Sequence, residues 1–177
     1  MKVSVVTPNY NGERFLKTFL ESLNEDSEYI GEVIIIDNGS SDSSIDYLKN
    51  NKFNFPLVLI ENKENVGFSP AVNQGIRKAK NSLIFSINND TEIKKGSIKK
   101  LIDLITSSDD IFSVQAKMLQ YNNKDLIDDV GDEYNLLAWT KKVGENHKSS
   151  EYVEVRDIFS SCAGAAMYNK SILEEIG

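Results

Sequence analysis

The sequence has few of the residues that cross-link secreted proteins or build zinc sites, and it has no long apolar run. Its 177 residues include one cysteine and one histidine. A lone cysteine forms no internal disulfide and suits a reducing compartment. No apolar run approaches the ~20 residues that a membrane-spanning helix needs. The first residues, MKVSVVTPNY, do not resemble a secretion signal, because Pro8 breaks the apolar run and no small-residue cleavage site follows. We therefore expect a cytoplasmic protein.

Positive charge is also scarce. Lysine and arginine number 20 against 27 aspartates and glutamates, which gives a net charge of −7. This balance disfavours nucleic acid as a partner. A small anionic ligand remains compatible with it, because backbone N–H groups, helix N-termini and a bound cation can hold an anion without basic side chains.

Three common catalytic motifs are missing. The chain has no G-x-x-x-x-G-K-[ST], which argues against a P-loop nucleotidase, and no H-E-x-x-H. The segment TPNYNGER after the first apolar run lacks G-x-G-x-x-G, which argues against a dinucleotide-binding enzyme. The single histidine, His147, lies in a polar segment and is better explained as a solvated loop residue than as a catalytic base.

The first 120 residues alternate between two hydrophobic periods. Short apolar runs predict strands at 3–6, 32–36, 57–60, 83–87 and 112–118, and helical spacing predicts helices at 12–24, 43–50, 71–80 and 96–106. Alternating elements with nearly continuous Val, Ile and Leu strands are typical of a parallel sheet that is covered on both faces. The predicted fold class is therefore α/β, with a mostly parallel central sheet flanked by helices.

The remaining residues follow a different pattern. Residues 121–150 are polar and weakly periodic, and we expect a long excursion there with a helical turn near Trp139. Residues 153–159 predict another strand. A run of small residues follows at 160–166, where another body could approach the backbone closely, and residues 171–176 begin a helix.

Polar clusters follow three of the predicted strands, at residues 7–11, 37–40 and 88–90. Right-handed crossovers bring the carboxyl ends of parallel strands to one edge of the sheet, where ligands bind in folds of this kind. We therefore expect the three clusters to face one cleft.

Each cluster admits two interpretations. Asp90 could ligate Mg²⁺ or Mn²⁺, or cap the helix that follows. Asp37 could accept a hydrogen bond from the imide N–H of uracil or thymine, or serve the turn at Gly39. Tyr10 could stack on such a base, or simply lie at the sheet boundary, while the amides at 88–89 could contact a ribose or the waters of a metal.

Four segments together resemble the nucleotide-sugar glycosyltransferases of family 2, which have the GT-A fold. They are VSVVTPNYNGERFLKTFLESL, EVIIIDNGSSDSS, ENKENVGFSPAVNQGIRKAKNSLIFSINNDTEI and SCAGAAMYNKSILEEIG, in the family's order and at its spacing. The resemblance covers essentially the whole chain and looks most like the branch that includes rhamnosyltransferases. It implies one GT-A (Rossmann-like) donor-binding domain over 1–177, with a nucleotide-binding half at 1–120 and the start of an acceptor-side half at 121–177.

The resemblance also implies roles for individual residues. Asp90 would be the ligand for Mn²⁺ or Mg²⁺ at the second acidic position of the family's D-x-D motif, with Asn88 at the first. The nucleotide and donor sugar would be bound by Pro8, Tyr10, Asp37, Asn65, Gly67, Asn73, Asn88, Asn89, Gly164 and Ala165. For Asn65, Gly67 and Asn73, loop and helix-start chemistry is an equally good explanation, and Cys162 is interpreted as a small packing residue.

The implied activity is inverting transfer of a sugar from a UDP- or dTDP-sugar to a hydroxyl of a glycan or a lipid-linked acceptor. The general base that such transfer needs is expected beyond Gly177, so we expect the chain to be the donor-binding part of a longer transferase. That protein could associate peripherally with the inner face of a membrane.

Two other functions stay open. One is a non-catalytic module that binds a nucleotide sugar. The other is a sugar nucleotidyltransferase, which should have a glycine-rich, basic loop after the first strand, whereas residues 8–11 are neither.

Overall fold

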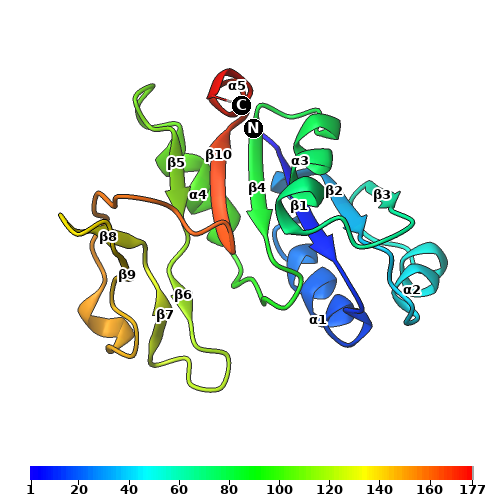
Figure 1. Ribbon diagram of the computed structural model, residues 1–177, viewed down its shortest axis with the longest axis horizontal. Helices are drawn as coiled ribbons and strands as arrows, with labels where there is room; N and C mark the ends of the chain where they lie inside the picture. The colour runs from blue at the N-terminus through cyan, green and yellow to red at the C-terminus, as the bar shows by residue number, and fades with distance from the viewer. Residues whose placement is uncertain (177) are drawn as a thin grey trace.

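A six-stranded sheet forms the centre of the computed structural model, which describes residues 1–176 (Figure 1). The strand order is β3-β2-β1-β4-β10-β5. The first four strands in this order pair in parallel, and β10 is antiparallel to both of its neighbours. The bounds are β1 Val3–Asn9, β2 Ile30–Asp37, β3 Leu57–Glu61, β4 Leu83–Ile87, β5 Ser113–Gln115 and β10 Ala165–Asn169.

Helices cover both faces of this sheet. The bounds are α1 Glu13–Asn24, α2 Ser44–Asn50, α3 Phe68–Lys78, α4 Ser97–Ile105 and α5 Lys170–Ile176, with 3₁₀ turns at Ser27–Tyr29 and Ser149–Glu151. Side chains of α1, α2 and α4 share one buried cluster with Val5 and Phe85, whereas α3 and Leu173 of α5 pack in a second cluster with Val6 and Ile84. Because neighbouring residues of a strand point to opposite faces, each central strand contributes to both clusters. The predicted α/β class and mostly parallel sheet are confirmed.

The bounds of the first half agree with the sequence prediction to within a few residues. The largest differences are of three residues: β1 ends at Asn9 rather than at residue 6, and α3 begins at Phe68 rather than at residue 71. None of the helices in residues 1–176 is long and apolar enough to cross a membrane.

From residue 112 onward, the structure departs from the prediction at three places. The first is the single strand predicted at 112–118, which is instead two short strands in different sheets. β5 joins the central sheet, while β6 Met118–Leu119 pairs with β7 Ile127–Asp129. These two strands and the following hairpin lie beside the sheet, on the side of β5 (Figure 1).

The second difference is at Trp139, where the predicted helical turn is wrong. Residues 132–142 form a β-hairpin of β8 Asp132–Tyr134 and β9 Thr140–Lys142. The side chain of Asn135 accepts hydrogen bonds from the backbone N–H groups of Leu137 and Trp139, at 2.9 and 3.3 Å. A side chain that satisfies local N–H groups in this way stabilises a turn over a helix.

The third difference is the strand predicted at 153–159, which the structure does not contain. Val153, Val155 and Phe159 are 72%, 74% and 65% exposed, so their alternation does not reflect burial. The strand lies further on, at β10, where Ala165, Ala166 and Met167 are buried between β4 and β5. Because β10 runs antiparallel to β4, its first residues lie at the edge where β4 ends.

A buried carboxylate starts α4. Asp26, which is 2% exposed, accepts hydrogen bonds from the N–H groups of Gly96 and Ile98 at 2.7 and 3.0 Å. The helix begins at Ser97, seven residues after Asp90, and Gly96 is its N-cap residue. The capping interpretation of Asp90 is therefore wrong, because Asp26 satisfies the N–H groups that Asp90 was expected to bind.

We predict that Asp26→Ala lowers the free energy of unfolding by about 2–3 kcal/mol, because two buried N–H groups lose a charged acceptor. Asp26→Asn keeps one acceptor oxygen and should lose about half as much. Urea denaturation measures both values. Glu25→Ala, which removes a neighbouring exposed acid, is the control, and a loss of equal size in this variant would contradict the prediction.

Candidate donor-binding site

Side-chain hydrogen bonds join the carboxyl ends of β2, β1 and β4. The amide of Asn9 donates to Oδ2 of Asp37 at 2.8 Å, and the amide of Asn89 donates to Oδ1 of Asn9 at 2.6 Å. Asn9 is only 1% exposed. We call this chain, Asp37–Asn9–Asn89, the amide bridge. It brings the first, second and fourth strands of the sequence to one edge, as the three polar clusters predicted.

The carboxylate of Asp37 is fully enclosed. Its Oδ1 accepts the backbone N–H of Ser40 at 2.9 Å, and its Oδ2 accepts the Ser40 hydroxyl at 2.7 Å in addition to Asn9. Asp37 therefore serves the turn after β2, which was one of its two interpretations. A direct contact between Asp37 and a base would require Ser40 to move.

Gly12 allows the amide bridge to lie against the start of α1. A Cβ atom at this position would come within 3.0 Å of both Nδ2 of Asn89 and Oδ1 of Asn9, closer than real Cβ contacts. Gly12 is also the N-cap residue of α1. The absence of a side chain at residue 12 therefore lets helix and bridge pack together.

Asp90 lies directly after the bridge residue Asn89 and is exposed. Among residues 1–176 its side chain has no hydrogen-bond or ion-pair partner, whereas the backbone of Asn88 is held by the Thr91 hydroxyl at 2.6 Å. A free carboxylate beside amide oxygens suits a hard cation. The described residues include no group of three His, Cys, Asp or Glu side chains that could hold a metal by themselves. A cation at Asp90 would therefore need further oxygen ligands from elsewhere.

The small residues before β10 contact the end of β4. The backbone N–H of Asn88 donates to the carbonyl of Gly164 at 3.0 Å, and Ala165 pairs with Ile87. The structure therefore brings Gly164 and Ala165 to Asn88. Cys162 is half-buried beside them.

Asn38 organises the loop after β3. Its side-chain amide, in a residue that is 4% exposed, donates to Oδ1 of Asn65 and to the carbonyl of Gly67, at 2.9 and 3.1 Å. Its own Oδ1 accepts the backbone N–H of Val66 at 3.1 Å. Asn65 and Gly67 are thus joined to the end of β2, whereas Asn73 is an exposed residue of α3 with no side-chain hydrogen bond among residues 1–176.

Two predicted contacts of the nucleotide come from the end of β1. Pro8 is half-buried within the strand, and the side chain of Tyr10 is 53% exposed just after it. An exposed ring at this edge is free to stack on a planar ligand.

The sequence analysis missed Asn9, Asn38 and Ser40 as individual residues. All three stand inside the polar clusters that the analysis singled out, next to Pro8, Asp37 and Gly39. Their position within these clusters was the signal that could have identified them. Residue type alone does not reveal which polar side chain turns inward.

The sheet order, with parallel strands that end at one edge and one antiparallel strand beside β4, defines a GT-A fold. Solved structures with the same fold include TarS of S. aureus, with a TM-score of 0.68 and 20% identity over 99% of this chain and 49% of TarS. Another is the mannosyltransferase PcManGT of Pyrobaculum calidifontis, with a TM-score of 0.70 and 15% identity over 99% of this chain and 46% of PcManGT.

The model of the family described as "Glycosyl transferase family 2" matches residues 4–177, and the chain belongs to this family. YfnE of Bacillus subtilis, an uncharacterized glycosyltransferase, is 36% identical over 58% of this chain and 26% of its own length. YwdF of the same organism is 25% identical over 100% of this chain and 61% of its own length. TuaG, a putative teichuronic acid biosynthesis glycosyltransferase of B. subtilis, is 27% identical over 63% of this chain. The chain thus spans less than two thirds of the length of the relatives it matches.

We predict that Asn9→Asp lowers the free energy of unfolding at pH 7 by about 3–5 kcal/mol, because it buries a second carboxylate against Asp37. The neighbouring negative charge raises the pKa of the introduced acid in the folded state. The folded variant then binds a proton that the unfolded chain releases, so its loss relative to the wild type should shrink as the pH falls from 7 towards 5.

Urea denaturation at both pH values measures this loss. Asn11→Asp is the matched control, because Asn11 is exposed and an aspartate can still accept the backbone N–H of Ser41 that Asn11 accepts at 2.8 Å. An equal loss in the two variants, or a loss in Asn9→Asp that does not change with pH, would show that the amide bridge contributes little.

Proposed function

We propose that the protein transfers a sugar, with inversion, from a nucleoside-diphosphate sugar to a hydroxyl of a glycan or a lipid-linked acceptor, and that residues 1–177 supply its donor-binding part. The observation that supports this most is the amide bridge. It ties together the edge that carries Tyr10, the turn at Asp37 and the free carboxylate of Asp90. The ring and the carboxylate suit the base and the diphosphate of one donor.

The bridge gives each donor-side residue a defined task. The exposed ring of Tyr10 stacks on the base, while Asp37 holds Ser40 and Asn9 in position beside it. The side-chain NH₂ group of Asn89 donates to Asn9. Oδ1 of Asn89 is therefore the atom that we assign to the ribose. Gly164 and Ala165 give the donor sugar a surface without bulky side chains next to Asn88.

The proposed cofactor is Mn²⁺ or Mg²⁺, held by Asp90 together with donor oxygens. When bound, the cation would offset negative charge on the departing diphosphate. The solved structure of PcManGT is a complex with GDP-Man and Mn²⁺, and TarS has been solved in complexes with UDP and with UDP-GlcNAc. These ligands support a nucleotide-sugar donor here, and we propose a UDP- or dTDP-sugar.

The proton-accepting step of the reaction has no assigned residue within this chain. Inverting transfer needs a base to accept the proton of the acceptor hydroxyl, and we propose that this base follows Gly177. A growing polysaccharide is the proposed acceptor, in line with the name of TuaG. The single cysteine supports a reducing, cytoplasmic location, which includes the inner face of a membrane. The rhamnosyltransferase-like branch stays a prediction.

The alternative is a module that binds a nucleotide sugar without turning it over. The shorter length of the chain relative to YfnE and TarS is compatible with this function for residues 1–177. Release of free sugar or nucleotide from the donor, followed by NMR, distinguishes the two. A sugar nucleotidyltransferase is disfavoured by the family and by the loop at residues 8–11, which is neither glycine-rich nor basic.

We predict that UDP or dTDP together with Mn²⁺ raises the melting temperature. A ligand at a hundred times its dissociation constant stabilises the folded state by ~2.7 kcal/mol, which corresponds to about 5–11 °C for a chain of this size. Differential scanning fluorimetry measures the shift, with Mn²⁺ alone and nucleotide plus EDTA as controls. Identical melting curves with every nucleotide and metal pair would contradict donor binding.

We predict that Asp90→Ala removes the metal-dependent part of this shift and leaves the melting temperature of the free protein within about 2 °C of wild type, because the exposed carboxylate makes no internal contact. Asp110→Ala is the matched control, since Asp110 is an exposed acid before β5, at the opposite edge of the sheet. A metal-dependent shift that survives in Asp90→Ala would exclude Asp90 as the ligand.

A further inference from the structure

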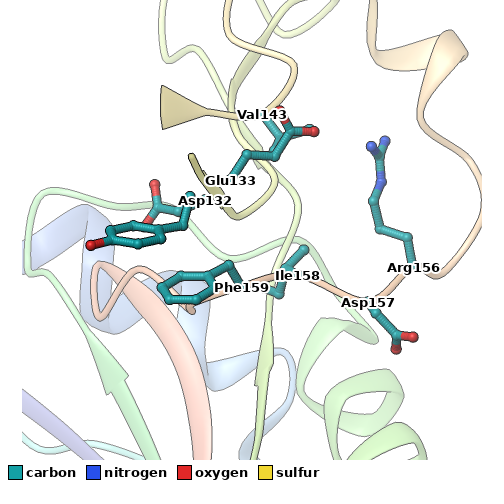
Figure 2. Close-up of a pocket in the computed structure, with 8 residues that line it drawn as sticks. Asp132, Glu133, Val143, Arg156, Asp157, Ile158 and Phe159 are labelled. Carbon is teal, nitrogen blue, oxygen red and sulfur yellow. The ribbon is translucent and has the colours of Figure 1, made fainter. Parts of the chain in front are cut away.

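A cavity lies away from the edge that carries the amide bridge. It has a volume of about 330 Å³ and lies between the β8–β9 hairpin and residues 156–159 (Figure 2). This volume is at the low end of the range of about 300–1,000 Å³ that is typical of small-molecule sites. It therefore suits a ligand of one or two rings better than a long one.

Backbone and side-chain hydrogen bonds fix the two walls to each other. The N–H of Phe159 donates to the carbonyl of Asp132 at 3.1 Å, and the N–H of Asp132 donates to the carbonyl of Ser160 at 3.2 Å. The Ser160 hydroxyl donates to Oδ2 of Asp132 at 2.9 Å. Gly131, with φ 113°, lets Ile158 pack against the base of the hairpin, because a Cβ there would come within 3.0 Å of Ile158. These hydrogen bonds and the packing at Gly131 thus fix the positions of the two walls of the cavity relative to each other.

The aromatic part of the lining is exposed. The rings of Tyr134 and Phe159 stack with centroids 4.7 Å apart and planes at 12°. Yet the two residues remain 49% and 65% exposed. Large aromatic surfaces that are left open in a preformed cavity are typical of a binding site.

Charged groups face the same space. Figure 2 shows the side chains of Glu133 and Arg156 rising from two different segments of the lining, whereas the carboxylate of Asp157 points the other way. Among residues 1–176 neither Glu133 nor Arg156 has an ion-pair partner. The guanidinium of Arg156 lies 4.3 Å from the centre of the Tyr152 ring, which restricts its position.

This combination matches the chemistry of a sugar ring. The C–H face of a pyranose is apolar and can lie on an aromatic surface, while each hydroxyl at its rim both donates and accepts hydrogen bonds. Glu133 supplies an acceptor and Arg156 supplies donors at opposite positions. The carboxylates of Asp132 and Glu133 outnumber the one guanidinium of the lining, so a neutral saccharide is favoured over a phosphorylated or uronic one.

The cavity is connected to the donor edge through one short segment. Residues 160–164 leave it directly after Phe159 and end at Gly164, whose carbonyl binds the N–H of Asn88. Between them, the N–H of Cys162 is held by Oε1 of Gln115 at 2.7 Å. A ring bound in the cavity would therefore lie at the far end of residues 160–164 from Asn88.

We propose that this cavity binds a neutral sugar ring of the acceptor glycan, a role that rests on the proposed function. The test uses the 177-residue chain and methyl glycosides of glucose, galactose, mannose, N-acetylglucosamine and rhamnose, with methyl glucuronide as the anionic probe. Saturation-transfer difference NMR measures binding. At least one neutral glycoside should bind, and more tightly than the glucuronide.

Phe159→Ala should weaken the binding of that glycoside by about tenfold or more. Removing an aromatic ring on which a nucleic-acid base stacks lowers the binding affinity by a comparable amount. Phe159→Trp, which keeps a stacking surface, should retain binding and so exclude a loss caused by misfolding. Tyr121→Ala is the matched control, because Tyr121 is an aromatic residue of similar exposure, 64%, outside the cavity. It should bind as the wild type does.

Absence of binding by every glycoside, preference for the glucuronide, or an equal loss in Tyr121→Ala would overturn the proposal. The nucleotide–Mn²⁺ melting shift, measured on the same variants, should be unchanged. Glycoside binding without any nucleotide shift would reject the proposed function and with it the acceptor role. A nucleotide shift without glycoside binding would reject this cavity alone.

Discussion

The hydrogen bonds of the amide bridge fix the ends of three strands relative to one another. Asparagine suits the central position because one amide both donates and accepts, so Asn9 can link Asp37 to Asn89 without placing a second charge in a buried site. Buried hydrogen bonds to a carboxylate are costly to break. The loops after β1, β2 and β4 therefore have a common geometry before any ligand arrives, and a preorganised site loses less entropy when it binds.

The other side of the molecule is joined to this edge by a second, partly buried network of hydrogen bonds. Gln115 of β5 donates to Oδ1 of Asp129 at 2.8 Å and accepts the backbone N–H of Cys162 at 2.7 Å. Asp129 also accepts the N–H of Gly131, at the base of the hairpin. The hairpin, the edge strand and the segment that leads to Gly164 are therefore linked through two side chains.

The sequence predicted the first half well because its strands are buried on both faces, and continuous Val, Ile and Leu runs identify such strands directly. It failed at residues 153–159, where alternating apolar side chains are exposed, and at β10, whose Ala165 and Ala166 lack the β-branched or aromatic side chains typical of strands. Clusters at strand ends predicted where the candidate site lies. They could not predict that the carboxylate of Asp37 turns inward, because side-chain direction depends on a partner, Asn9, that is distant in sequence.

The close packing at Gly12 limits how the sequence can diverge. A Cβ atom at residue 12 would come too close to the side-chain amides of Asn9 and Asn89, so a larger residue there requires at least one of these amides to shift or to be replaced. Asn9 and Gly12 lie at least 77 positions before Asn89 in the sequence. We nevertheless expect the three residues to vary together among related chains. Loss of the glycine at the start of α1 in a relative would then indicate a different arrangement of the asparagine pair at this edge of the sheet.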